Sequence, residues 1–369
     1  MSPRRILRGA GAACLEALVF TLARKLPRED RPPEEPGSIF VLRNNDVGDL
    51  LVVTPLFDAL HRRFPRARLV AGVGSWNLDV LRENPHVSEV LAIDAPWFNK
   101  YAADAGPWGR LAWVFRSPQS RTLALRRFEV GIDVLGSGWG SLLLLEAGIP
   151  YRLGVRGYAG GHTAAQRSIR FDPGEHVGRS ALRFAEALGA TDLPPVRPQV
   201  FLTAAEREAG ERLWSPERRR RIVVGPGGGL VVKRWPRERF AALLPRLPEL
   251  GEVDVAVVGG PLERGLAPEL AAGAPGARSL PDLSLRETFA LVAAADLVLC
   301  NSSLLMHAAA AFGKPTVVLL GESFPSAREH QAQWGYPGTC LSLGRERGER
   351  NSLATPGEAL AAAREVGGA

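Results

Sequence analysis

Four short polar segments carry the side chains that could do chemistry, and each stands between an apolar, β-branched run and a helical pattern. The first segment runs from Asn44 to Asp49 and also contains Asn45 and Asp46. Asp49 falls in the first turn of the expected helix, where a carboxylate can act as a general base toward an acceptor hydroxyl. A carboxylate at this place also caps helices, and Asp46 is a second candidate in the same loop. The local sequence therefore leaves both roles open.

The second segment, 225–236, reads GPGGGLVVKRWP. Backbone amides of consecutive glycines, here including Gly227 and Gly228, can approach an anion closely. Lys233 stands out because only four of the 46 basic residues are lysines, and a compact ammonium suits a point contact with a departing phosphate. A flexible loop with solvated charges fits the same residues. No Walker GK[ST] sequence follows the glycines.

Two further segments of this kind contain Glu263 and the run from Ser302 to His307. Glu263 could accept hydrogen bonds from a ribose or another sugar, although a lone glutamate there more often complements the helix dipole. Ser302 and Ser303, with their amides, could hold a phosphate at a helix N-terminus or simply cap the helix. His307 lies about one turn into that helix, a place that also suits a packed core histidine.

Short β-branched runs alternate with helical patterns from Ser38 onward, which is typical of parallel sheets covered by helices on both faces. The expected strands are 39–43, 68–73, 89–93, 130–135, 152–155, 221–224, 253–258, 297–300 and 316–320. Helices are expected to begin near residues 49, 76, 108, 139, 176, 237, 263, 285 and 303. The sequence therefore predicts an α/β protein of two Rossmann-like domains, with ligands at the carboxyl ends of the strands in a cleft between them.

Prolines between Thr191 and Thr203 mark the boundary between these domains. We expect four parts: 1–37, a basic helix and proline-rich linker; 38–190, the first domain; 200–345, the second; and 346–369, a helical tail. Residues 1–28 carry +5 of the net charge of +7. Their apolar run is shorter than the about 20 residues that span a bilayer. They therefore predict a basic amphipathic helix on an anionic membrane surface, or one that packs on its own domain or a partner.

The composition excludes several other classes of protein. Outside residues 1–28 the chain carries only +2, so a nucleic-acid-binding body is not expected. Cys14, Cys300 and Cys340 form no CxxC pair, and the chain has no HExxH motif or Cys/His cluster, so neither a disulfide framework nor a metal site is predicted. The absence of a GxSxG motif weighs against an α/β-hydrolase.

Together these segments resemble glycosyltransferase family 9, the ADP-heptose:lipopolysaccharide heptosyltransferases. The resemblance covers the chain from residue 39 to about 320. It rests on FVLRNNDVGDLLVVTPL (40–56), KRWPRERF (233–240), VVGGPLER (257–264), and ADLV with MHAAA and GKPTV between 295 and 317. Each motif alone is weak, but four in this order at suitable spacing are specific enough to indicate the family.

The resemblance implies a GT-B fold in which residues 38–190 bind the acceptor and 200–345 bind the nucleotide sugar. It implies inverting transfer that needs no metal or resident cofactor, with ADP-heptose as the family's donor, to a lipopolysaccharide-core or other lipid-linked glycan. By the same resemblance Asp49 is the catalytic base and Lys233 the diphosphate contact. Glu263 contacts the donor nucleoside, while Ser302, Ser303 and His307 line the donor end. The place of action would be cytoplasmic, peripheral to the inner membrane.

The chain departs from the family pattern in two places. Ser302, Ser303 and Leu304 stand where the family usually has Asp-Ser-Gly, and Asn44 and Asn45 replace small or hydroxylated residues. Two alternatives to transfer therefore stay open. One is a GT-B protein that binds a glycan or nucleotide without transfer, and the other is a nucleotide-sugar epimerase.

Overall fold

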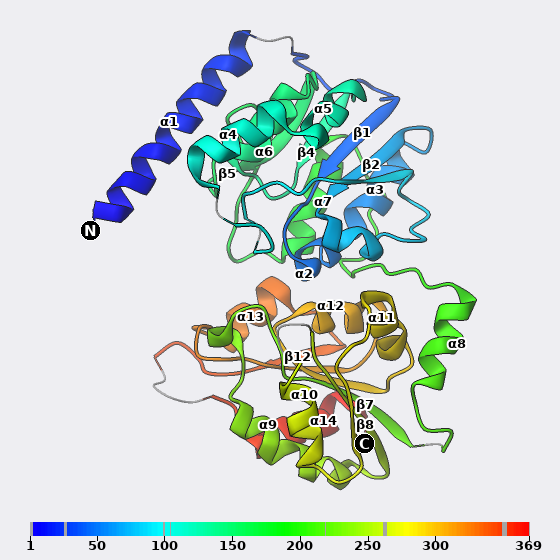
Figure 1. Cartoon of the computed structure of the whole chain (residues 1–369). Coiled ribbons are helices and arrows are strands. Elements are labelled where there is room, and N and C mark those ends of the chain that lie inside the picture. The colour runs from blue at the N-terminus through cyan, green and yellow to red at the C-terminus, as the bar shows by residue number, and fades with distance from the viewer. Residues whose placement is uncertain are drawn as a thin grey trace. The chain divides into compact units, whose positions relative to one another are not determined.

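A computed structural model of the chain describes residues 3–25, 28–98, 100–103, 105–217, 219–260, 264–348 and 353–368, with side chains from residue 14 onward. The chain divides into two compact units. The first contains Met1–Pro173 and Gly178–Pro195, and the second contains Gly174–Val177 and Val196–Ala369. Each unit is an α/β layer structure built on its own parallel sheet (Figure 1).

The first unit contains a six-stranded parallel sheet in the order β3-β2-β1-β4-β5-β6. Its strands are β1 (Ser38–Leu42), β2 (Arg68–Val73), β3 (Glu89–Ala92), β4 (Val130–Asp133), β5 (Tyr151–Arg156) and β6 (Arg167–Arg170). The helices of this part of the chain are α1 (Pro3–Lys25), α2 (Val47–Leu51), α3 (Pro55–Arg63), η1 (Ser75–Val80), α4 (Gly106–Arg116), α5 (Pro118–Leu125), α6 (Gly138–Glu146) and α7 (Val177–Ala187).

The second unit repeats this arrangement with a parallel sheet in the order β12-β11-β10-β7-β8-β9. Its strands are β7 (Arg220–Gly225), β8 (Val253–Val258), β9 (Ala277–Leu280), β10 (Leu297–Asn301), β11 (Thr316–Leu319) and β12 (Cys340–Leu343). Its helices are α8 (Ala204–Arg212), η2 (Val231–Lys233), α9 (Arg237–Leu243), η3 (Leu244–Leu250), α10 (Leu266–Ala272), α11 (Leu285–Ala293), α12 (Leu304–Ala311), α13 (Ala327–Trp334) and α14 (Pro356–Gly367).

Both sheets have the strand order of a doubly wound α/β domain. In each, the direction of connection reverses between the first and fourth strands, β1 and β4 in one unit and β7 and β10 in the other. Ligands of such sheets bind outside the carboxyl ends of the strands at this reversal. The loops that follow these four strands are therefore where a site is expected in each unit.

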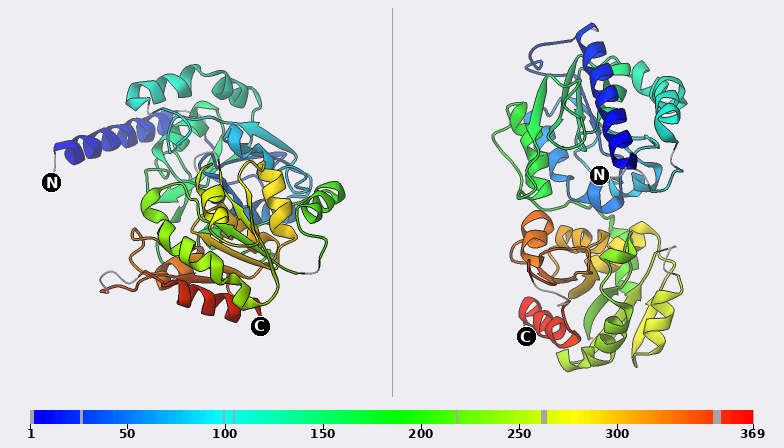
Figure 2. Two further views of the ribbon diagram at one scale, coloured as in Figure 1. Left: turned by 60° about the horizontal axis from the view of Figure 1, so that its bottom comes forward. Right: turned by 90° about the vertical axis from the view of Figure 1, so that its left-hand side faces the viewer.

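The β-branched and leucine-rich strands are buried on both faces, as parallel strands covered by helices must be. In the second unit Ile222, Val224, Leu297 and Leu299 pack with Leu360 of α14 in one core cluster. The right-hand view of Figure 2 shows α14, in red, lying along α9. The C-terminal helix is thus part of the second unit's core.

The N-terminal helix α1 packs on the first unit through its C-terminal half. Val19 and Ala23 are buried in the same core cluster as α6, and Leu15 and Leu22 pack against it. Leu18 and Phe20, on other sides of the helix, remain 43% and 47% exposed. In the described part of the chain, no helix is long and apolar enough to cross a membrane. The C-terminal half of α1 therefore packs on its own domain, which was one of the roles expected for this helix.

Two features differ from the expected elements. The helix expected from Asp49 through Phe57 is broken into α2 and α3. Pro55 begins α3 and has no N–H to donate to the carbonyl of Leu51, which instead accepts a hydrogen bond of 2.7 Å from the Thr54 hydroxyl. The sequence also missed β6, β9 and β12, which lie at sheet edges and contain polar or small residues, so they lack the apolar runs of the central strands.

Candidate active site

Asp49 lies in α2, directly after β1, at the strand reversal of the first unit. Its Oδ1 is 3.4 Å from a terminal nitrogen of Arg43, and its backbone carbonyl accepts a hydrogen bond of 3.1 Å from Arg43 Nε. The Asp49 side chain is 29% exposed, whereas that of Arg43 is 8% exposed. A buried arginine therefore holds the carboxylate in place while leaving it open to solvent, as a base that receives a proton from a ligand must be.

The asparagines before Asp49 are buried and fix the path of the loop. The backbone carbonyl of Asn45 accepts hydrogen bonds from Trp76 Nε1 at 2.8 Å and Asn77 Nδ2 at 2.7 Å. Asn44 Nδ2 and Asn45 Oδ1 are buried and find no hydrogen-bond partner in the described part of the chain. The buried asparagine side chains and the two hydrogen bonds to the Asn45 carbonyl thus fix the conformation of the loop that leads to Asp49.

Asp46 is differently placed from Asp49. Its carboxylate forms an ion pair of 3.1 Å with Lys100, and both side chains are more than one-third exposed. It stands at the N-cap position of α2 but makes no capping hydrogen bond with its side chain. Of the two carboxylates in the loop, Asp49 is thus the one that a buried cation positions.

Asp133, at the end of neighbouring β4, was not recognised from the sequence. It is fully buried and accepts a hydrogen bond of 2.8 Å from the backbone nitrogen of Ser137. Burial raises its pKa to about 6, against the effect of backbone hydrogen bonds and of the Arg43 charge. Asp133 therefore fixes the loop after β4 through its hydrogen bond to Ser137. The positive charge of Arg43 acts on both Asp133 and Asp49.

In the second unit, Asn301 joins the two loops at the strand reversal. This fully buried residue ends β10, and its Nδ2 donates to the carbonyls of Pro226 at 2.7 Å and Gly227 at 2.9 Å. Its Oδ1 accepts a hydrogen bond of 2.8 Å from the backbone nitrogen of Trp235. One amide side chain therefore holds both ends of the loop that contains Gly228 and Lys233.

The glycine loop has a second internal tie and an exposed cation. Arg234 donates from Nε and a terminal nitrogen to the carbonyl of Gly228, at 2.9 and 2.7 Å. Lys233 ends η2 with its side chain exposed and its Nζ 5.9 Å from the ring centroid of Phe324. The loop is thus held in shape by Asn301 and Arg234, while Lys233 is presented to solvent.

The turn between β10 and α12 contains both serines. Ser303 is the N-cap residue of α12 but makes no capping hydrogen bond with its side chain. The Ser302 hydroxyl is bound at 2.8 Å to Nε2 of His330, whose Nδ1 is 2.8 Å from the Ser342 hydroxyl. Burial, and secondarily the positive charge of Lys233, lower the pKa of His330 to about 4. The neutral imidazole of His330 therefore orients the Ser302 hydroxyl.

His307 is 5% exposed and lies behind this turn. Its Nδ1 is 2.5 Å from the Tyr336 hydroxyl, and burial lowers its pKa to about 3. It is a neutral, packed histidine of α12 and supports the turn from the core side. Glu263, the remaining candidate, lies outside the described residues.

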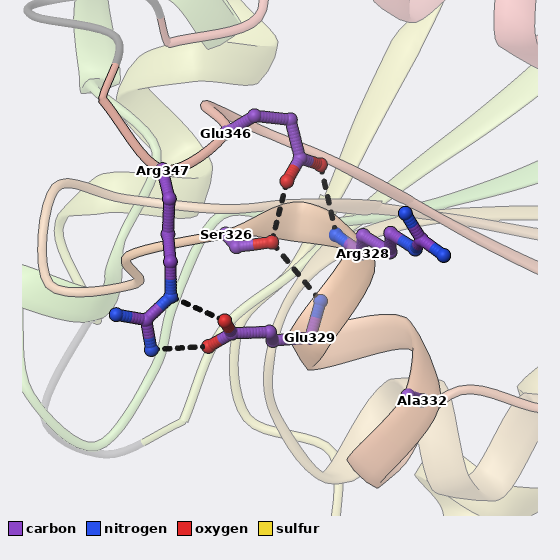
Figure 3. Close-up of a pocket in the computed structure, with 6 residues that line it drawn as sticks. All are labelled: Ser326, Arg328, Glu329, Ala332, Glu346 and Arg347. Carbon is purple, nitrogen blue, oxygen red and sulfur yellow. Dashed lines mark hydrogen bonds and ion pairs between the residues drawn. The ribbon is translucent and has the colours of Figure 1, made fainter. Parts of the chain in front are cut away.

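A surface hollow of about 370 Å³ lies at the start of α13, and Figure 3 shows the hydrogen bonds and the ion pair among the residues that line it. Glu346 accepts hydrogen bonds from the Ser326 hydroxyl and, at 2.9 Å, from the backbone nitrogen of Arg328. Glu329 is paired with Arg347. Both carboxylates of the hollow are thus engaged, and the network fixes the first turn of the helix that carries His330.

Replacing His330 with glutamine is expected to make the protein less sensitive to acid. Because the folded-state pKa is below the ordinary value of 6.5, the folded protein binds fewer protons here than the unfolded chain. The contribution of neutral His330 to the free energy of unfolding is therefore fully present above about pH 6.5 and is lost as the pH falls toward 4. At about pH 5 the loss is about 2 kcal/mol, or a few degrees in Tm. Calorimetry at about pH 7.5 and 5 should show a smaller Tm decrease in the variant; equal decreases would contradict this role.

The comparisons with known proteins identify the family and the fold of this chain. Residues 118–349, more than half of the chain, match the model of glycosyltransferase family 9 (heptosyltransferase). Lipopolysaccharide heptosyltransferase 2 of Escherichia coli strain K12 is 26% identical over 302 residues, which cover 78% of this chain and 83% of the relative.

Solved structures show the same fold. The E. coli ADP-heptose lipopolysaccharide heptosyltransferase II aligns with a TM-score of 0.70 and 22% identity over 89% of this chain and 98% of that one. The E. coli heptosyltransferase WaaC with ADP aligns with a TM-score of 0.69 and 17% identity, over 89% and 99%. The two doubly wound sheets are thus those of a GT-B fold, and the family match establishes that the chain belongs to glycosyltransferase family 9, the heptosyltransferases.

Proposed function

We propose that this glycosyltransferase moves heptose, or a closely related sugar, from ADP-heptose to the core of lipopolysaccharide or a similar lipid-linked glycan. The donor and acceptor are those that the names of its relatives carry. We further propose that transfer inverts the anomeric carbon and requires no metal ion. In this reaction the acceptor oxygen forms a bond to the anomeric carbon as the bond to the diphosphate oxygen breaks.

Asp49 takes the acceptor proton in this proposal. Its partly exposed carboxylate sits at the strand reversal of the first unit and is held by Arg43 at 3.4 Å. Asn44 and Asn45 in the same loop would support this acceptor site, because the hydrogen bonds from Trp76 and Asn77 to the Asn45 carbonyl hold the loop in shape. The base and the cation that orients it thus come from the short segment that follows β1.

The observation that carries the proposal is the preorganised loop of the second unit. In support of this, Asn301 and Arg234 hydrogen-bond to carbonyls of the glycine loop, so the backbone around Gly227, Gly228 and Lys233 is held in shape without a ligand. The exposed Lys233 ammonium would neutralise charge on the departing diphosphate, and donors fixed in advance stabilise such charge without the cost of reorganisation. Ser302, oriented by His330, and Ser303 would complete the donor contacts. Glu263 would contact the nucleoside.

The test is incubation of the full chain with ADP-heptose and a lipopolysaccharide core lacking the terminal heptose, in the presence of EDTA. We expect a product one heptose heavier with the anomeric configuration inverted, and stabilisation by ADP of about 2.7 kcal/mol at 100 times its Kd. Conversion of the donor without acceptor would instead identify an epimerase. Stabilisation by ADP with no product from any core would identify a protein that binds the nucleotide without transfer. The departure from the family pattern at Ser302–Leu304 would then account for the missing activity.

We also propose a peripheral membrane contact through residues 1–28, at the cytoplasmic face of the inner membrane. The net charge of these residues and the exposed side chains of Leu18 and Phe20 support it. Cations and apolar side chains together bind helices to anionic bilayers. Co-sedimentation of the full chain with anionic vesicles tests this contact, and complete recovery in the supernatant would contradict it.

A further inference from the structure

A cavity of about 330 Å³ lies in the first unit, on the side where α1 packs. Its walls are the last turns of α1, the segment just after it, β5, and the loop that follows β5. The lining residues are Phe20, Ala23, Arg24, Arg28, Arg152, Arg156, His162, Thr163, Ala164, Ala165 and Gln166. In Figure 1, α1 is the dark blue helix at the side of this unit. Neither Asp49 nor any other residue assigned above to the reaction lines this cavity.

The charged side chains among the described lining residues are all cationic. Four of the described lining residues are arginines and none is acidic. Arg24 comes from α1, Arg28 from the segment after it, and Arg152 and Arg156 from β5. Arg152 and Arg156 are four residues apart in a strand, so their side chains leave the same face of the sheet.

Arg152 is the fixed member of this group. It is 2% exposed, its Nε donates to the carbonyl of Ala164 at 2.8 Å, and a terminal nitrogen donates to the carbonyl of Ile149. Burial and the neighbouring charge of Arg28 lower its pKa to about 10. In the part of the chain that the structure describes, neutral carbonyls and no carboxylate bind this guanidinium. A buried cation with further cations beside it is electrostatically unfavourable until an anion enters.

The other three arginines have little competing charge. Arg28 is 3.5 Å from Asp30, but this pair is largely exposed and therefore weak. Arg24 stacks over the ring of Phe20 at 4.0 Å, and Arg156 Nε is 3.4 Å from the Ser168 hydroxyl. Among the described residues, Arg24 and Arg156 have no carboxylate partner, so their terminal nitrogens can bind an anion.

His162 provides a second observation at the same place. Its Nδ1 is buried and has no hydrogen-bond partner in the described part of the chain. The neighbouring Thr163 is fixed, because its hydroxyl donates to the carbonyl of Gly160 at 2.8 Å. His162 lines the same cavity as the four arginines, and an imidazole N–H is a hydrogen-bond donor that suits an oxyanion.

We propose that this cavity is a binding site for the phosphate group of a phosphorylated ligand, separate from the residues assigned to donor and acceptor. Guanidinium forks match the oxygens of phosphate in geometry and charge. Phe20 and Ala23 add an apolar wall beside the cations, which suits a phosphate attached to a larger group. The same chemistry is offered by a phospholipid headgroup and by a soluble phosphorylated molecule.

The first experiment is calorimetric titration of the Lys233→Gln protein with inorganic pyrophosphate, so that the proposed donor contact does not contribute. Adding Arg24→Gln and Arg156→Gln, both exposed positions, should weaken binding about tenfold or more, since each charge-assisted hydrogen bond lost is worth about a factor of ten. The matched control Arg116→Gln removes an exposed arginine of α4 and should leave binding unchanged. Arg156→Lys, which keeps the charge but not the fork, should fall between.

The second experiment separates the two sources of phosphate. Vesicles of phosphatidylcholine with and without phosphatidic acid are co-sedimented with the same proteins. Binding of phosphatidic acid vesicles that Arg156→Gln weakens and Arg116→Gln does not would assign a lipid headgroup, because Arg156 lies in β5 and not in the membrane-contact segment. Pyrophosphate binding without such vesicle binding would assign a soluble ligand. Equal affinities of the cavity variants and the control for both probes, or no binding of either probe, would overturn the proposal.

Discussion

Replacing Asp49 with asparagine is expected to lower kcat by about two to four orders of magnitude while leaving donor affinity nearly unchanged. Asparagine has nearly the same shape and can still accept a hydrogen bond from Arg43, which is 3.4 Å from the present carboxylate. It cannot accept the proton of an acceptor hydroxyl at neutral pH. Turnover with ADP-heptose and a truncated core, together with calorimetric titration of ADP, measures both quantities.

Asp46→Asn is the matched control for this experiment. The two carboxylates lie in the same loop, but that of Asp46 is paired with exposed Lys100 and not with buried Arg43. The control should retain turnover within about fivefold, as expected for the loss of an exposed ion pair. If Asp49→Asn retained near wild-type turnover and Asp46→Asn did not, the base would have to be reassigned within the loop.

Replacing Lys233 with methionine is expected to lower kcat/KM by about two to three orders of magnitude, an effect comparable with the loss of one preorganised donor to a developing anion. Unlike Asp49→Asn, this change should also weaken ADP binding, because the ammonium contacts the diphosphate before and after transfer. Methionine keeps the length of the aliphatic stem. The loop should stay folded, since Asn301 and Arg234 hold it without the Lys233 side chain.

Two further substitutions sharpen this result. Lys233→Arg retains the charge and should recover part of the lost activity and ADP affinity. Arg237→Gln removes an exposed cation four residues away that is paired with Glu269 at 2.6 Å, and it should have little effect on either quantity. Unchanged ADP affinity in Lys233→Met would remove Lys233 from the diphosphate site.

The sequence was sufficient to predict the loops of the candidate site, because their position depends on local order along the chain. Polar segments after β-branched strands identified the loops that contain Asp49, Lys233 and Ser302, and the parallel sheets place these loops at strand reversals. That inference needs only the alternation of strand and helix and the rule for ligand placement in doubly wound sheets. The central strands were predicted within one or two residues because buried parallel strands are continuously apolar.

The residues that orient the site could not be predicted in the same way. Asn301 binds carbonyls 75 and 74 residues away in sequence, and His330 binds Ser302 across 28 residues. Their roles depend on which strands are neighbours, and no local pattern around either residue indicates that. Arg43 had a local signal, since it is the only cation in the strand and loop that lead to Asp49.

The packing of α1 links the thermal stability of the first unit to its affinity for a membrane. Val19 and Ala23 belong to the core of the first unit, so α1 cannot leave the unit to enter a bilayer without uncovering that core. A membrane would instead meet the helix through its outer side while the inner side stays in place. Anything that binds the docked helix and not the unfolded chain raises the free energy of unfolding of the first unit. Anionic vesicles should therefore act as a thermal stabiliser of this unit, and the size of that stabilisation would report the membrane affinity.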